Sequence, residues 1–132
     1  MGFEEVQHTA DWSVRVWGND LPDLFAESAR AMNALSGLAI GPGPRLRRHF
    51  QAEGQDPEGL LVAFLSELIY LAEEAGLGFE RFDVGMPVPP LSLSMEGGPI
   101  VRLDKAIKAV TWHDLKITRT ERGLETIIVF DV

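Results

Sequence analysis

Two anionic groups stand side by side at the end of the sequence IIVFDV, where Asp131 is followed by the α-carboxylate of Val132. Carboxylate oxygens are hard ligands that suit Ca²⁺ or Mg²⁺ much better than Zn²⁺. Adjacent anions repel each other unless a cation or a hydrogen-bond donor compensates them. Residues 127–132 therefore allow two interpretations, a strand that happens to end in Asp-Val or part of a divalent-cation site.

Four further polar residues with useful chemistry are expected at corners or strand ends, namely His8, Asp11, His113 and Asp114. Taken singly, each is typical of a turn or cap, and Asp11 can close an Asx turn. Taken with Asp131, they also suit a metal-dependent phosphohydrolase. In that alternative the two aspartates Asp11 and Asp131 hold the ion, and His8 or His113 acts as the base.

The basic side chains gather in one short stretch, RLRR, which contains Arg45, Arg47 and Arg48. This pattern favours a solvated strand edge over a phosphate or RNA contact, and His49 fits either interpretation. Lys108 lies in AIKAVTW, where an isolated lysine usually points to solvent. The formal net charge is −8, so the surface as a whole repels phosphate and we expect no direct binding of nucleic acid.

Several functional classes lack their motifs in this chain. There is no cysteine, and the sequence holds no GxxxxGK[ST], GxGxxG, HExxH or GxSxG. The stretch MGFEEVQHTADWS has glutamates where a signal peptide needs a basic start. No apolar run approaches the ~18 residues of a membrane span. We therefore expect a cytoplasmic protein without membrane association.

The elements that must position these residues follow from the spacing of apolar side chains. Alternation predicts strands at 3–6, 12–18, near 45–54, 79–84, 91–96, 105–120 and 124–132, the last two flanking a hairpin loop at 121–123. One helix should follow the cap Asp20 and stop at Gly37, and a second should run from Asp56 to Gly76.

The second helix carries the broader apolar stripe, so we expect it to be the better buried of the two. Strands outnumber helices by about seven to two, and hairpins replace regular strand and helix alternation. The sequence therefore predicts an α+β fold, with mostly antiparallel sheet or sheets and two packed helices, in one domain over residues 1–132.

Five segments, in order, closely resemble the archease family: HTADWSVRVWG, LFAESARAMNAL, GLLVAFLSELIYL, IKAVTWHDLKI and IIVFDV. The resemblance covers essentially the whole chain and implies a small two-layer α+β protein. It also implies a function without catalysis, as an activator of the GTP-dependent tRNA-splicing RNA ligase. Such an activator promotes guanylylation and multiple turnover of the ligase in tRNA splicing or RNA repair, so the ligase is the expected partner.

The same resemblance implies a divalent-cation site, seen in the family with calcium. Its ligands are the aspartate of the HTAD motif, the penultimate aspartate and the terminal residue, which here are Asp11, Asp131 and Val132. We therefore expect Ca²⁺ as the cofactor, with Mg²⁺ or Mn²⁺ as alternatives.

Three further residues fall on positions of family motifs. Lys108 is the lysine of the KAVT motif and is expected to be functional, and His8 and His113 are secondary candidates. Trp112 stands where the family usually has tyrosine, which removes a hydroxyl from the surface expected to face the ligase. A general chaperone or modulator also fits an acidic α+β domain, although it gives the terminal carboxylates no role. The sequence leaves the oligomeric state open.

Overall fold

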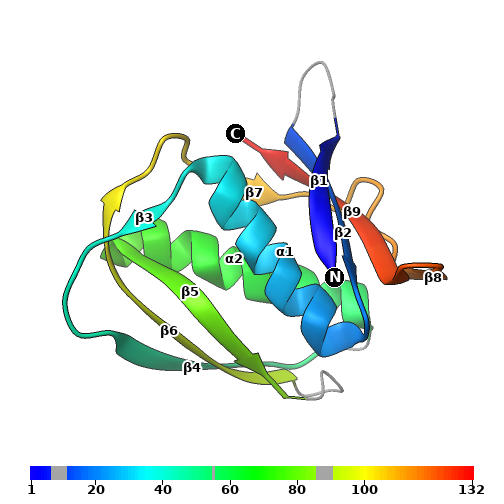
Figure 1. The fold of residues 1–132 in the computed structure, drawn as a ribbon, viewed down its shortest axis with the longest axis horizontal. Coiled ribbons are helices and arrows are strands. Elements are labelled where there is room, and N and C mark those ends of the chain that lie inside the picture. Colours follow the sequence, from blue (N-terminus) through cyan, green and yellow to red (C-terminus); the bar gives the residue numbers. More distant parts are fainter. Residues whose placement is uncertain (7–11, 55, 86–90) are drawn as a thin grey trace.

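The computed structural model describes residues 1–6, 12–54, 56–85 and 91–132 of the chain. These residues form two α-helices and nine strands, and the strands make two sheets with antiparallel pairing throughout. The α+β class predicted from the sequence is confirmed. Figure 1 shows the helices between the two sheets, with the C-terminal strand in the sheet that also contains the N-terminal hairpin.

The larger sheet has five strands in the order β1-β2-β9-β7, with β8 also paired to β9. Its strands are β1 (Gly2–Val6), β2 (Trp12–Gly18), β7 (Ala109–Val110), β8 (Thr118–Thr120) and β9 (Gly123–Asp131). The central strand β9 pairs with β2 along one edge and with β7 and β8 along the other. The expected hairpin between β8 and β9 is confirmed, and Gly123 has a φ of 111° that suits a glycine in a turn.

The smaller sheet is organised around one long strand that pairs with the other three. Its strands are β3 (Ala39–Ile40), β4 (Leu46–Ala52), β5 (Leu77–Val84) and β6 (Leu91–Arg102), with β6 as the shared partner. Its inner face is apolar because alternate β6 residues, Leu91, Leu93 and Met95, point into the core.

Both helices begin and end as their sequences predict. They are α1 (Leu21–Ser36) and α2 (Pro57–Ala75). A side-chain oxygen of Asp20 accepts a hydrogen bond from the N–H of Asp23 at 2.9 Å, and Asp56 caps α2 in the same way. Gly37 and Gly76 follow the helices in the left-handed conformation, with φ of 64° and 65°. In the described chain, neither helix is long and apolar enough to cross a membrane.

The hydrophobic core lies where the helices meet the two sheets. Helix α1 contacts β1, β2 and β9 of the larger sheet and β5 of the smaller one, and α2 contacts β7 as well as β4 and β5. Phe25 of α1 stacks on Phe64 of α2 with ring centroids 6.3 Å apart. Phe82 of β5 meets Phe64 edge-on at 5.7 Å. Each buried aromatic of this kind stabilises the fold by ~1.5–3 kcal/mol, so this cluster fixes the helices against the sheets.

The prediction that the second helix is the better buried one is wrong. Nine of the 16 residues of α1 are buried, against seven of the 19 in α2. The reason is the placement of α1, which contacts three strands of the larger sheet in addition to β5 and α2. Its small residues, such as Ala29 and Ala31, allow these close contacts.

The predicted strand over residues 105–120 is also wrong for most of its length. Only the short strands β7 and β8 form there, and the intervening residues 111–117 are irregular, with a turn at 113–114 in which Asp114 has a φ of 58°. The apolar residues Ile107, Leu115 and Ile117 still pack against the core. Their alternation with polar residues therefore reflects one-sided packing of an irregular segment rather than sheet pairing.

Candidate functional site

Asp131 is the last residue of β9, and its side chain is exposed. Its neighbour Phe130 is fully buried in the core, so strand alternation places Asp131 on the outer face of the larger sheet. At this end, β9 is held on both sides. Trp12 of β2 faces Phe130, and Ala109 of β7 faces Asp131.

Lys108 is brought next to Asp131 by a main-chain contact. The N–H of Lys108 donates a hydrogen bond to the carbonyl oxygen of Asp131 at 2.8 Å. The N–H of Thr111 donates similarly to Val129 at 2.9 Å, which fixes the β7 segment along β9. The side chain of Lys108 is exposed, so its charge is available near this strand end.

The proposed metal ligands fall partly outside the described residues. Asp11 and His8 both lie in 7–11, which the structure does not describe. Asp131 and Val132 are described. The side-chain carboxylate of Asp131 lies at the end of β9, and Val132 follows directly after it. Within the described ranges no group of three or more His, Asp or Glu side chains is arranged to hold a metal ion.

A buried hydroxyl lies on the same sheet face as Asp131. Ser13 faces Val129 across the β2–β9 pair, and Val129 precedes Asp131 by two residues, so alternation places all three on one face. The Oγ of Ser13 is fully buried and has no hydrogen-bond partner in the part of the chain that the structure describes. Buried polar atoms nearly always have partners. Ser13 is not evident from the sequence, because a serine in an alternating strand resembles a solvent-facing residue.

The other histidine candidate is placed in a different local environment. His113 Nε2 lies 3.3 Å from Oδ2 of Asp114, and both side chains are largely exposed. The N–H of His113 donates a hydrogen bond to the hydroxyl oxygen of Thr111 at 3.2 Å. Among the described contacts, none joins His113 to Asp131. The adjacent Trp112 is 60% exposed, which is unusual for so large an aromatic side chain.

Two of the three arginines in the stretch 45–48, which leads into β4, pair with carboxylates of neighbouring strands. Arg45 pairs with Glu80 of β5, and Arg47 pairs with Glu96 of β6 at 2.7 Å. The hydrogen bond from Arg47 and its positive charge hold the pKa of Glu96 below its usual value, and the same carboxylate raises the pKa of Arg47. These pairs neutralise two of the three arginines, which favours the solvated-edge interpretation over a phosphate contact.

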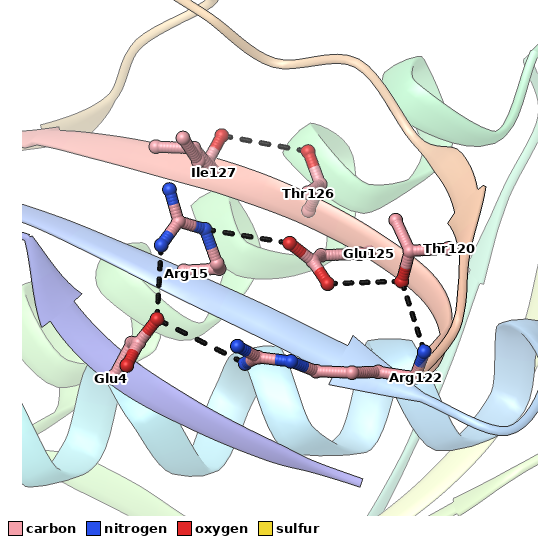
Figure 2. Close-up of polar contacts among 7 residues, drawn as sticks. All are labelled: Glu4, Arg15, Thr120, Arg122, Glu125, Thr126 and Ile127. Atoms are coloured by element: carbon pink, nitrogen blue, oxygen red, sulfur yellow. Dashed lines mark hydrogen bonds and ion pairs between the residues drawn. The ribbon is translucent and has the colours of Figure 1, made fainter.

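The centre of the larger sheet carries a second compensated network, drawn in Figure 2. Arg15 of β2 lies 2.9 Å from Glu4 of β1 and 3.4 Å from Glu125 of β9. Arg122 approaches the same Glu4 at 3.9 Å and stacks over the ring of Trp17, with 4.1 Å from the guanidinium carbon to the ring centroid. The carboxylates of this network therefore have cationic partners within the sheet.

Together, the fold and the site define a small acidic α+β protein with antiparallel sheets, whose central strand ends in an exposed carboxylate. The Archease protein family model matches residues 3–132, and the chain belongs to this family. The resemblance seen in the sequence is confirmed. Archease proteins are known as activators or chaperones, and a function of this kind involves a partner protein.

Curated relatives agree with this assignment, and solved structures agree with the fold. The protein archease of Methanopyrus kandleri is 31% identical over 135 residues, which cover 92% of each chain. That of Pyrococcus furiosus is 29% identical over 136 residues, covering 92% of this chain and 91% of the relative. The crystal structure of an archease, possible chaperone, from Thermotoga maritima has a TM-score of 0.71 at 22% identity, over 98% of this chain and 96% of its own. The solution structure of Methanobacterium thermoautotrophicum protein 1598 has a TM-score of 0.73 at 22% identity, over 99% of both chains.

Proposed function

We propose that this protein activates a GTP-dependent tRNA-splicing RNA ligase, promoting its guanylylation and multiple turnover, with a divalent cation bound at the end of β9. The observation that carries the proposal is the exposed Asp131. Among the described residues, its carboxylate has no ion-pair partner. The carboxylates of Glu4 and Glu125 in the same sheet, in contrast, are paired with arginines.

The ligands proposed for the cation are Asp11, Asp131 and the carboxylate that Val132 carries when it is the last residue. Covalent connectivity supports this set, since Asp11 is bonded to Trp12 and Trp12 faces Phe130, the neighbour of Asp131. Ca²⁺ takes six to eight oxygen ligands, so water or partner groups would complete its coordination. When bound, the ion supplies concentrated positive charge at an otherwise acidic strand end.

The residues around this strand end have complementary roles in the proposal. Asp131 binds the ion, and the N–H of Lys108 holds the Asp131 carbonyl. The exposed side chain of Lys108 can contact phosphate or carboxylate on the partner. The buried hydroxyl of Ser13 can donate a hydrogen bond to a ligand carboxylate and orient it. A ligase must bind RNA and should present a basic surface. A chain of net charge −8 would approach such a surface quickly, and added salt would slow the encounter.

The proposal is tested by ligase turnover measured with and without this protein. We expect stimulation by the unmodified chain and its loss in Asp11→Ala, in Asp131→Ala and in a form with residues appended after Val132. Asp83→Ala is the matched control, because Asp83 is an exposed aspartate on a strand of the smaller sheet. Stimulation that survives the three changes at the strand end would contradict the metal-dependent activator.

Two further measurements separate the alternatives. Hydrolysis of nucleotide by this protein alone would favour the metal-dependent phosphohydrolase. Reduced aggregation of unrelated proteins, without any effect on the ligase, would favour the general chaperone. Neither alternative predicts that appended residues after Val132 abolish stimulation of the ligase.

A further inference from the structure

A cavity of about 190 Å³ lies between the two helices, β5 and the segment 103–108. Its apolar lining includes Met32, Leu38, Leu68, Ile69, Leu77 and Phe79. A cavity of ~150 Å³ with this kind of lining holds benzene, whereas sites for drug-sized ligands measure ~300–1,000 Å³. The volume therefore suits one aromatic ring or one branched aliphatic side chain, and is too small for a nucleotide.

Two uncharged polar side chains of the cavity wall, those of Asn33 and Ser36, already have partners within the protein. The amide nitrogen of Asn33 donates to the carbonyl of Phe79 at 2.7 Å, and the hydroxyl of Ser36 donates to the carbonyl of Asn33 at 3.1 Å. These bonds fix the wall and leave few donors for a polar ligand. An occupant of this cavity is therefore recognised mainly by its apolar surface.

The cavity is bordered by negative charge at the C-terminal end of α2. Glu73 lines the cavity, and both Glu73 and Glu74 are exposed in the last turn of α2, which contains no basic residue. Negative charge at a helix C-terminus is unfavourable because the helix dipole is negative there. Neither glutamate forms an ion pair with another described residue. A cationic group from outside the chain would relieve this repulsion.

The cavity is also connected to the proposed cation site. The segment 103–108 forms one of its walls, and the N–H of Lys105 in that segment donates to the carbonyl of Ser36 at 3.0 Å. At the other end of the segment, Lys108 lines the cavity and its N–H donates to Asp131 at 2.8 Å. A partner that reaches the end of β9 is therefore close to the mouth of the cavity.

We propose that this cavity receives one apolar side chain of the partner ligase, of leucine or phenylalanine size, next to a basic side chain of the same segment that pairs with Glu73. The inference rests on the proposed function and adds the place where the ligase is anchored. Apolar anchors that fill a pocket, flanked by charged contacts, are typical hot spots of protein interfaces. The net negative charge of the chain agrees with a basic partner segment.

The first test fills the cavity. Ala72 lines it from α2, so Ala72→Phe should occupy the space and weaken binding of the purified ligase at least 10-fold in a calorimetric titration. Ala75→Phe is the matched control, because Ala75 is exposed in the last turn of the same helix. Thermal unfolding of each variant verifies that it is folded.

A second variant tests the mouth without altering the core. Glu73→Lys should weaken ligase binding about 10-fold at low salt, as expected when a paired charge is reversed. Glu121→Lys changes the net charge by the same amount at an exposed turn between β8 and β9, and should weaken binding less than threefold. Unchanged affinity in both Ala72→Phe and Glu73→Lys would overturn the inference, and so would equal weakening by the two control variants.

The readout separates this inference from the proposed function. Variants of the cavity should still stimulate the ligase fully when their concentration is raised to saturation, because they lose affinity only. Asp131→Ala should bind the ligase and fail to stimulate it at any concentration. If the unmodified chain stimulates the ligase and the cavity variants match it at every concentration, the inference fails and the function stands. If the unmodified chain neither binds nor stimulates, both fail.

Discussion

Several exposed charges of the smaller sheet are paired, in contrast to the exposed carboxylate at the end of the larger sheet. On the smaller sheet, Arg47 and Glu96 neutralise each other at 2.7 Å, and Arg45 is neutralised by Glu80. At the end of β9, Asp131 is exposed and has no ion pair with another described residue. Surface pairs of the first kind contribute little to stability, but each places opposite charges side by side so that they compensate each other locally. The comparison suggests that the uncompensated end, rather than the arginine-rich strand, is the site that meets a charged partner.

The largest expected effect comes from adding the cation itself. At a Ca²⁺ concentration ~100 times its dissociation constant, the free energy of unfolding should rise by ~2.7 kcal/mol, because only the folded chain assembles the ligands. Calorimetric melting with Ca²⁺ and with a chelator measures this rise. Asp131→Ala should abolish the rise and Asp83→Ala should preserve it. An equal rise in both variants would place the ion elsewhere.

The second prediction concerns the buried hydroxyl beside the uncompensated end. Among the described residues the buried Ser13 hydroxyl has no hydrogen-bond partner, and an unsatisfied buried hydroxyl costs ~1–3 kcal/mol, so Ser13→Ala should raise the free energy of unfolding of the metal-free protein by ~1 kcal/mol. It should also reduce the stabilisation by Ca²⁺ if the hydroxyl orients a ligand. The control on the smaller sheet is Ser92→Ala, whose hydroxyl lies 3.1 Å from His49 Nε2 and should not stabilise the protein when removed. Urea denaturation measures the free energy of unfolding of both variants. A Ser13→Ala variant less stable than the unmodified chain would show that the hydroxyl has a partner.

The smallest effect should be found on the compensated sheet, as a dependence of stability on pH. The pKa of Glu96 is lowered in the folded protein by the hydrogen bond from Arg47. The contribution of Glu96 is therefore fully present above its unfolded pKa of ~4.3 and is lost as pH falls through the lower folded value. Glu96→Gln should lower stability slightly near pH 7, where the pair is present in the unmodified chain, and flatten the stability curve in that acidic window, where the unmodified chain loses the same contribution. Denaturation from pH 7 to pH 3 measures this, with the exposed Glu53→Gln as control; identical curves for Glu96→Gln and the unmodified chain would count against the pair.

Local signals in the sequence predicted the elements well. The caps Asp20 and Asp56 and the glycines Gly37 and Gly76 act within one or two turns, so their effect does not depend on the rest of the fold. The burial of α1 depends instead on which strands it contacts, and those contacts join residues far apart in the sequence. Alternation over 105–120 was misleading for a related reason, since an irregular segment packed on one side gives the same pattern as a strand.

The site was predicted only in part, for similar physical reasons. The exposure of Asp131 follows from its position after the buried Phe130, which alternation makes readable from sequence. The main-chain bond from Lys108 and the buried hydroxyl of Ser13 follow from strand register, which no short motif specifies. The cavity beside Lys108 depends on the packing of two helices, a strand and a loop. Asp11 and His8 lie outside the described residues, so their roles stay predictions.

The anchoring of β9 on both sides also has a consequence for binding entropy. Most flexible segments lose conformational freedom when they bind a partner, at ~0.5–1.5 kcal/mol for each immobilised side chain and more where the backbone is ordered. The backbone at Phe130 and Asp131 is already ordered, because Trp12 pairs on one side and Val110 and Ala109 pair on the other. The entropic cost of ordering this backbone is therefore met when the protein folds. A partner that binds this strand end loses no affinity to backbone ordering.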